Sequence, residues 1–213
     1  MKKIKIKEIF ERLEEKNPKP QTELIFNSPF QLLIAVILSA QTTDKAVNKV
    51  TVNLFKVAPC ASTLAKMPIE VVEKIINRIG LFKKKASFII KTSNLLLENH
   101  GGNVPASRQD LEKLPGVGRK TAGVILNVIF RQSEIAVDTH VSRVSYRLGF
   151  ADSLNTSELE NQLKKTIPDH HKLDAHNLLL LHGRYICKAK NPSCDSCFLK
   201  DLCNFGKQSL VIN

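Results

Sequence analysis

Apolar residues recur at helical spacing along most of this chain, and this periodicity limits the folds that the sequence can adopt. The apolar stripes are separated by Pro, Gly, Asn and Ser, which end helices and form turns. No stretch keeps the alternation of a β-strand, and no internal repeat is visible. The sequence therefore predicts an all-α fold.

Caps and breakers set the limits of the expected helices. Ser28 can cap a helix that has Pro29 at its first position, with Gln31 completing a capping box, and Ser157 with Glu160 forms a second such box. The helices that we expect cover residues 5–16, 30–39, 45–55, 68–78, 83–99, 107–114, 119–130, 140–148, 157–166 and 175–187.

The chain is strongly basic, with 32 Lys and Arg against 20 Asp and Glu and a net charge of +12. Such a field attracts a polyanion such as nucleic acid or an anionic membrane surface, although a general lysine bias would give the same count. The longest apolar run, Leu32–Leu38, is far shorter than the ~20 residues of a membrane-spanning helix. The N-terminus shows no secretory signal. We therefore expect an intracellular protein with no membrane partner.

Composition suggests two lobes. The stretch from about Thr22 to Arg131 is uniformly helical and apolar, whereas the region after Ser133 is richer in His, Cys and Asp. We expect a cleft between the lobes near residues 133–139.

The string LPGVGRKTA, at Leu114–Ala122, lies between two expected helices. Its glycines, Gly116 and Gly118, permit unusual backbone angles and keep the surface bare, so that a phosphate can approach the amides of Val117 and its neighbours. Arg119 adds positive charge at the start of the next helix. A tight helix–helix turn would also use two glycines, but the full string in a basic chain favours a DNA-binding hairpin.

Lys120 follows this hairpin directly. A partly desolvated lysine beside other cations has a lowered pKa, and its neutral amine can act as a nucleophile that forms a Schiff base. A lysine taken alone at this position is more often a solvated or phosphate-binding charge, so the interpretation depends on an acidic partner.

Asp138 is that candidate partner, in the string AVDTHVSRV at Ala136–Val144. It follows an apolar stretch and precedes a helix, which also makes it a helix cap. A capping carboxylate can still support a developing positive charge or steer a proton. His140 and Arg143 can reach phosphates from the same helix end.

Four cysteines follow the pattern C-x6-C-x2-C-x5-C near the C-terminus: Cys187, Cys194, Cys197 and Cys203. In a reducing cell, four thiolates at this spacing bind a metal centre. A zinc ion or one disulfide remains an alternative, although zinc ribbons usually show two CxxC pairs. Lys188 and Lys190 in the first loop can clamp a phosphate or simply improve solubility. Cys60 is expected to be a free thiol, buried or half-buried.

These strings, with SPFQLLIAVILSAQTTD at Ser28–Asp44 and LHGRYIC at Leu181–Cys187, resemble the endonuclease III family of helix-hairpin-helix DNA glycosylases. The resemblance runs nearly end to end. Adenine–mismatch glycosylases differ from this chain, with a serine in place of Lys120 and a catalytic glutamate near Ala35. The cluster loop has Asn191 and Ser193 where the family often has basic residues.

The resemblance implies an all-α fold of two helical lobes with a DNA-binding cleft, a helix-hairpin-helix motif and a C-terminal [4Fe-4S] cluster loop. Residues 22–132 would form a six-helix barrel domain, and residues 1–21 with 133–213 the iron–sulfur cluster domain. Gln41 and Leu81 match family residues that fill the gap left by a flipped-out base. From the residues alone, Leu81 can equally be a core leucine and Gln41 a polar helix end.

The implied reaction is base excision. Lys120 would attack C1′ of the damaged nucleotide, expel the base and form a Schiff base with support from Asp138, and a β-elimination would then cut the strand. The substrates would be oxidised pyrimidines such as thymine glycol, and abasic sites, in double-stranded DNA. We expect a monomer in a bacterial-type cytoplasm, associated with the nucleoid. A glycosylase without lyase activity and a non-catalytic DNA-binding module are the competing hypotheses.

Overall fold

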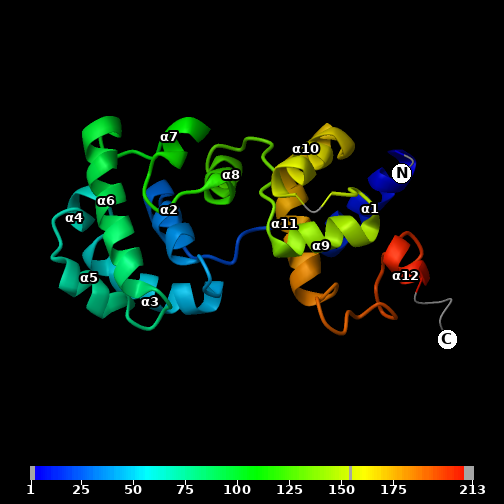
Figure 1. The fold of residues 1–213 in the computed structure, drawn as a ribbon, viewed down its shortest axis with the longest axis horizontal. Coiled ribbons are helices and arrows are strands. Elements are labelled where there is room, and N and C mark those ends of the chain that lie inside the picture. Colours follow the sequence, from blue (N-terminus) through cyan, green and yellow to red (C-terminus); the bar gives the residue numbers. More distant parts are fainter. Residues whose placement is uncertain (1–2, 154, 209–213) are drawn as a thin grey trace. The chain divides into compact units, whose positions relative to one another are not determined.

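The computed structural model describes residues 3–153 and 155–208 (Figure 1). Helices, turns and loops account for all of this part of the chain, in which no β-strand occurs. The prediction of an all-α fold is therefore confirmed. Within the same ranges, none of the helices combines the length and apolar character that a bilayer-spanning segment needs.

The chain divides into two compact units, Glu23–Phe130 and the combination of Met1–Thr22 with Arg131–Asn213. The first unit contains α2 (Pro29–Leu38), α3 (Asp44–Val57), α4 (Ala61–Leu64), α5 (Ile69–Ile76), α6 (Phe82–His100), α7 (Arg108–Glu112) and α8 (Arg119–Val128). The second contains α1 (Lys3–Lys16), α9 (Thr139–Leu148), α10 (Thr156–Thr166), α11 (Asp169–Tyr185) and α12 (Asn204–Gln208).

Helix α2 is the core of the Glu23–Phe130 unit. Every residue from Phe30 to Leu38 is buried, because α3, α6 and α8 all pack against this one helix. The Ser28 hydroxyl caps it by accepting a hydrogen bond from the Gln31 amide at 3.2 Å, as predicted. The Gln31 side chain does not complete a capping box, since its Oε1 accepts instead from the amide of Asn27.

The other unit is built on α11, which contacts both α1 and α9. The buried face of α1 carries Ile6, Ile9, Phe10 and Leu13 at helical spacing. Phe10 also stacks on the ring of His171 from α11, with centroids 5.3 Å apart. The N-terminal helix is thus part of the same core as the region that contains the cysteines.

Several local expectations were wrong. Helix α10 is capped by Asn155, whose Oδ1 accepts from the amides of Ser157 and Glu158, and Glu160 pairs with Lys164 at 2.9 Å instead of forming a capping box.

Helix α11 begins at Asp169, earlier than expected, because its first turn is polar and hides the apolar periodicity. The short helices α4 and α12 were not predicted. Cys60 is free but exposed, because its side chain lies at the start of the short helix α4.

The hairpin between α7 and α8 contains two glycines with different roles. Gly116 has φ +81°, and a Cβ there would lie 2.9 Å from the Phe88 ring and 3.0 Å from Ile37 Cγ2. Gly118 has an ordinary φ of −100°, and a Cβ there would meet nothing within 4 Å. The need for an unusual backbone angle is therefore confirmed at Gly116 and wrong at Gly118, which instead leaves the start of α8 open.

The two glycines give a matched test of this difference. Gly116→Ala combines left-handed backbone strain with overpacking, so we expect it to lower the free energy of unfolding by about 2 kcal/mol or more. Gly118→Ala changes only a helix cap and should cost less than about 1 kcal/mol. Urea denaturation followed by circular dichroism measures both, and equal losses would contradict this account of the hairpin.

Candidate active site and metal centre

Lys120 lies in the first turn of α8, one residue after the helix begins at Arg119. Its side chain is exposed, as are Gly116, Gly118 and Arg119. Val117 is buried and anchors the hairpin. The peptide dipoles of α8 favour an anion at this helix N-terminus. The hairpin therefore places the N-terminus of α8 and two exposed cations together on one surface.

The hairpin is held from both sides. Thr92 of α6 donates a hydrogen bond to the carbonyl of Pro115 at 3.0 Å, and Arg108 of α7 donates to the carbonyl of Arg119 at 3.2 Å. These contacts fix the backbone before Lys120 without using the lysine side chain.

Asp138 caps α9, as predicted. Its Oδ1 accepts hydrogen bonds from the amides of His140 at 2.9 Å and Val141 at 2.8 Å. The segment before it is tied down by His176 of α11, whose Nδ1–H donates to the carbonyl of Ala136 at 2.7 Å. The carboxylate is half-buried and borders a surface hollow that Thr139, Ser142, Arg143, Tyr146 and others line. It is therefore a fixed, accessible anionic group.

Arg143 lies one turn into α9 and bonds to backbone around it. Its Nε donates to the carbonyl of Cys187 at 2.9 Å and its Nη2 to that of Gly183 at 2.7 Å. The same Nη2 lies 3.2 Å from Nδ1 of His140. His140 and Arg143 thus form one group with the start of the cysteine loop.

Arg147, which the sequence analysis missed, repeats this contact one turn later. Its guanidinium donates to the carbonyls of Lys188 at 2.7 Å and Ala189 at 3.2 Å, and Nη1 lies 3.4 Å from the sulfur of Cys187. Its i,i+4 spacing from Arg143 on α9 was the available signal. The loop that carries Lys188 and Lys190 is therefore fixed at its start, while both lysine side chains are exposed.

The four cysteines form no disulfide and line one cavity, together with Arg147, His182 and Phe205 among others. Within residues 3–153 and 155–208, no three His, Cys, Asp or Glu side chains gather as they would around a single ion. In a cluster each cysteine binds a different iron, so thiolates spread around one cavity suit it. The donor set therefore fits an iron–sulfur cluster.

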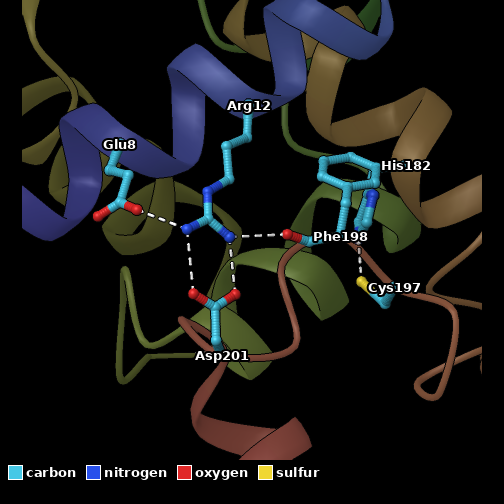
Figure 2. A network of polar contacts seen from close by, with 6 residues as sticks. All are labelled: Glu8, Arg12, His182, Cys197, Phe198 and Asp201. Atoms are coloured by element: carbon cyan, nitrogen blue, oxygen red, sulfur yellow. Dashed lines mark hydrogen bonds and ion pairs between the residues drawn. The ribbon is translucent and has the colours of Figure 1, made fainter.

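Burial controls protonation around this cavity. It raises the pKa of the Cys197 and Cys194 thiols, and the neighbouring cysteines raise both further. Burial also lowers the pKa of His182 to about 4, so this ring is neutral at neutral pH. Its Nε2 lies 3.8 Å from the sulfur of Cys197 (Figure 2). Burial thus favours the neutral thiol form of Cys194 and Cys197.

Arg12 ties the segment between the last two cysteines to the N-terminal helix, as Figure 2 shows. Its Nη1 donates to the carbonyl of Phe198 at 2.9 Å and to Asp201 Oδ1 at 2.7 Å, while Nη2 donates to Asp201 Oδ2 at 3.0 Å and to Glu8. The guanidinium holds the pKa of the Asp201 carboxyl below its usual range. Contacts between residues so distant in sequence gave the sequence analysis no signal.

Gln41 and Leu81 share an unusual conformation. Their φ angles are +54° and +58°, in the left-handed region that non-glycine residues rarely adopt. Both side chains are exposed, and Leu81 is 58% exposed, so it is not a core leucine. Arg131 and Asn191 share this backbone conformation, so it is the exposure of Gln41 and Leu81 that keeps both available for the contacts expected of them.

Two family models match this chain. Residues 34–169 match the HhH-GPD superfamily of base excision DNA repair proteins, and residues 187–203 match the iron-sulfur binding domain of endonuclease III.

Individual proteins are similar over nearly the whole length. Endonuclease III of Escherichia coli strain K12 is 51% identical over 208 residues, which is 98% of this chain and 99% of that protein. Endonuclease III of Haemophilus influenzae matches with the same identity and coverage. A solved structure of a trapped endonuclease III–DNA covalent intermediate matches with a TM-score of 0.91 and 44% identity, covering 99% of each chain.

The Arg12 contacts predict how firmly the cysteine segment holds its cluster. In Arg12→Gln the segment loses its bidentate contact with Asp201, and because that carboxylate is largely exposed we expect only a roughly fivefold faster loss of iron. The decay of the cluster's visible absorbance in the presence of an iron chelator measures the rate. Lys7→Gln, which alters an exposed lysine of the same helix, is the control. Equal decay rates for the two variants would show that Arg12 does not hold the segment.

Proposed function

This chain belongs to the endonuclease III family of base excision DNA repair proteins, and we propose that its substrates are oxidised pyrimidines, such as thymine glycol, and abasic sites in duplex DNA. It is a DNA glycosylase with abasic-site lyase activity and carries a [4Fe-4S] cluster. The observation that supports a lysine nucleophile most directly is the exposed Lys120 in the first turn of α8, directly after the hairpin.

Lys120 is the proposed nucleophile. The neutral amine attacks C1′ of the damaged nucleotide, the bond from C1′ to the base breaks, and the base leaves with a proton. Opening of the sugar ring then gives an imine between C1′ and the lysine nitrogen. Loss of a proton from C2′ breaks the C3′–O3′ bond by β-elimination, and hydrolysis of the imine frees Lys120.

Asp138 is proposed to support this attack electrostatically. Positive charge develops on the sugar as the base departs, and a carboxylate fixed by two amides needs no reorganisation to stabilise it. The same carboxylate makes the cap and carries the charge, so a structural and a chemical role coincide in one group.

DNA contacts are proposed for three groups of residues. The hairpin amides of Gly116, Val117 and Gly118, with Arg119, bind backbone phosphates without reading sequence. His140 and Arg143 flank the α9 start, and the exposed Lys188 and Lys190 extend the basic surface along the cysteine loop. Gln41 and Leu81 fill the gap that the flipped-out nucleotide leaves in the duplex.

The two units have separate proposed tasks. The Glu23–Phe130 unit is proposed to be the barrel domain with the hairpin, expected over residues 22–132, and the other unit the cluster domain, expected over residues 1–21 and 133–213. When bound, the cluster cross-links the four cysteines and so orders the loop that bears Lys188 and Lys190. We further propose that the chain acts as a monomer on the bacterial nucleoid.

Borohydride trapping tests the nucleophile. Borohydride reduces the imine to a stable amine, so wild-type protein mixed with a thymine glycol duplex should give a covalent protein–DNA adduct on a denaturing gel. Lys120→Gln should give none. Lys113→Gln, an exposed lysine just before the hairpin, should trap as well as wild type. A wild-type protein that binds the duplex but forms no adduct would exclude the lyase mechanism.

Asp138→Asn separates the two roles of the carboxylate. Asparagine caps helices as well as aspartate does, so the melting temperature should stay close to that of the wild type. Removal of the charge should lower the single-turnover rate of base release by about 100-fold or more. Asp138→Ala should lose both rate and stability. If the rate for Asp138→Asn were within twofold of that of the wild type, the carboxylate would have only its structural role as a helix cap.

A further inference from the structure

Lys85 of α6 is buried, with only 3% of its surface exposed, although its neighbours Lys83 and Lys84 are exposed. It lies on the same helix face as the buried residues Ile89, Thr92 and Leu96. Burial lowers the pKa of its ammonium group. Lysine is almost never fully buried unless it is paired, so this side chain must meet a specific need.

The side chain of Lys85 reaches from α6 to a turn that is distant in sequence. Its Nζ donates a hydrogen bond to Thr42 Oγ1 at 2.7 Å, across 43 positions of sequence. Lys85 lies in the first turn of α6, where its backbone amide makes the ordinary helical hydrogen bond to the carbonyl of Leu81 at 3.0 Å. The Lys85 side chain therefore connects the turn that contains Gln41 to the first turn of α6, which follows Leu81 directly.

Gln41, at φ +54°, and Leu81, at φ +58°, are both exposed and both have left-handed backbone, a conformation that Arg131 and Asn191 also adopt. The Gln41 turn is short, closed by the Thr42 amide bonding to the Ser39 carbonyl at 3.0 Å. The Thr42 hydroxyl accepts from Lys85 and can donate its own proton to the carbonyl of Ala40 at 3.4 Å. Strained backbone persists only where its surroundings hold it, and the Lys85 contact supplies that support from within the protein.

We propose that Lys85 is a positioning residue that fixes Gln41 and Leu81 relative to each other, so that both side chains enter the duplex together at a flipped-out nucleotide. This inference rests on the gap-filling role proposed above. Lys85 itself is buried and touches no DNA. Lys85 therefore affects how much more tightly the protein binds a duplex with a gap than an intact duplex. In an intact duplex the side chains of Gln41 and Leu81 have no space to enter.

The test compares binding to a duplex that carries a stable abasic-site analogue with binding to the same duplex undamaged. Lys85→Met keeps the length of the buried side chain and removes the donor. We expect it to weaken binding to the abasic duplex by about tenfold, the equivalent of one well-made polar contact, and binding to the undamaged duplex by less than about twofold. Lys83→Met, an exposed lysine of the same helix, should leave the ratio of the two affinities unchanged.

The acceptor gives a second route that does not depend on how well the core tolerates Lys85→Met. Thr42→Val removes the hydroxyl and should lower the same ratio, whereas Thr42→Ser keeps it and should preserve the ratio. The Lys85→Met and Thr42→Val double variant should lose no more than the worse single variant, because both break one contact. A purely structural role would instead change both affinities alike.

Separate outcomes identify which idea fails. If Leu81→Ala and Gln41→Ala discriminate as well as wild type, the gap-filling assignment and this proposal fail together. If those variants lose discrimination while Lys85→Met and Thr42→Val keep it, Lys85 has no positioning role. The binding assay requires no chemistry, so a failure to trap a Schiff base would refute the proposed reaction and leave the Lys85 result to be judged separately.

Discussion

Hydrogen bonds between α9 and the backbone around it fix both the proposed catalytic carboxylate and the cysteine loop. At its N-terminus Asp138 accepts from the amides of His140 and Val141, and one and two turns later Arg143 and Arg147 donate to the carbonyls of Cys187 and Lys188. A helix keeps these groups in rigid register, so the loop position and the carboxylate position cannot vary independently. The cluster loop is therefore set in place through the same helix that orients Asp138.

The Glu23–Phe130 unit holds its proposed gap-filling residues, Gln41 and Leu81, on left-handed backbone. Gly116 also has a left-handed φ, but there a Cβ would collide with Phe88 and Ile37, so glycine is required. Gln41 and Leu81 have the same kind of backbone, but there the chain carries a side chain in place of glycine. Glycine at either position would relieve strain and lose only the side chain. The presence of both side chains despite the strain is consistent with the gap-filling role proposed for them.

The sequence predicted correctly those features that depend on residues close together in the chain. The apolar stripe and the Ser28 cap defined α2, and the residues around Asp138 identified a cap that the structure contains. Predictions that relied on a motif alone were less secure, since Asn155 outcompetes Ser157 as the cap of α10. The roles of Arg12, Arg147 and Lys85 were missed because the partners that tertiary packing brings to them lie 40 or more positions away in the sequence. For Lys85 one signal existed, a lysine at an apolar position of the helical stripe that ends in Leu96.

The positively charged residues of the chain differ in what they contact. Arg143 and Arg147 direct their guanidinium groups to backbone carbonyls, and Arg147 also lies 3.4 Å from a cysteine sulfur. These cations therefore stand beside a site where burial and mutual repulsion raise the pKa of the Cys194 and Cys197 thiols. Cluster binding requires four thiolates, and the negative charge that they bring offsets the two arginines. Arg147 thus lies where its charge can offset that of the thiolates, while Arg119, Lys188 and Lys190 are exposed and available for the proposed contacts with DNA.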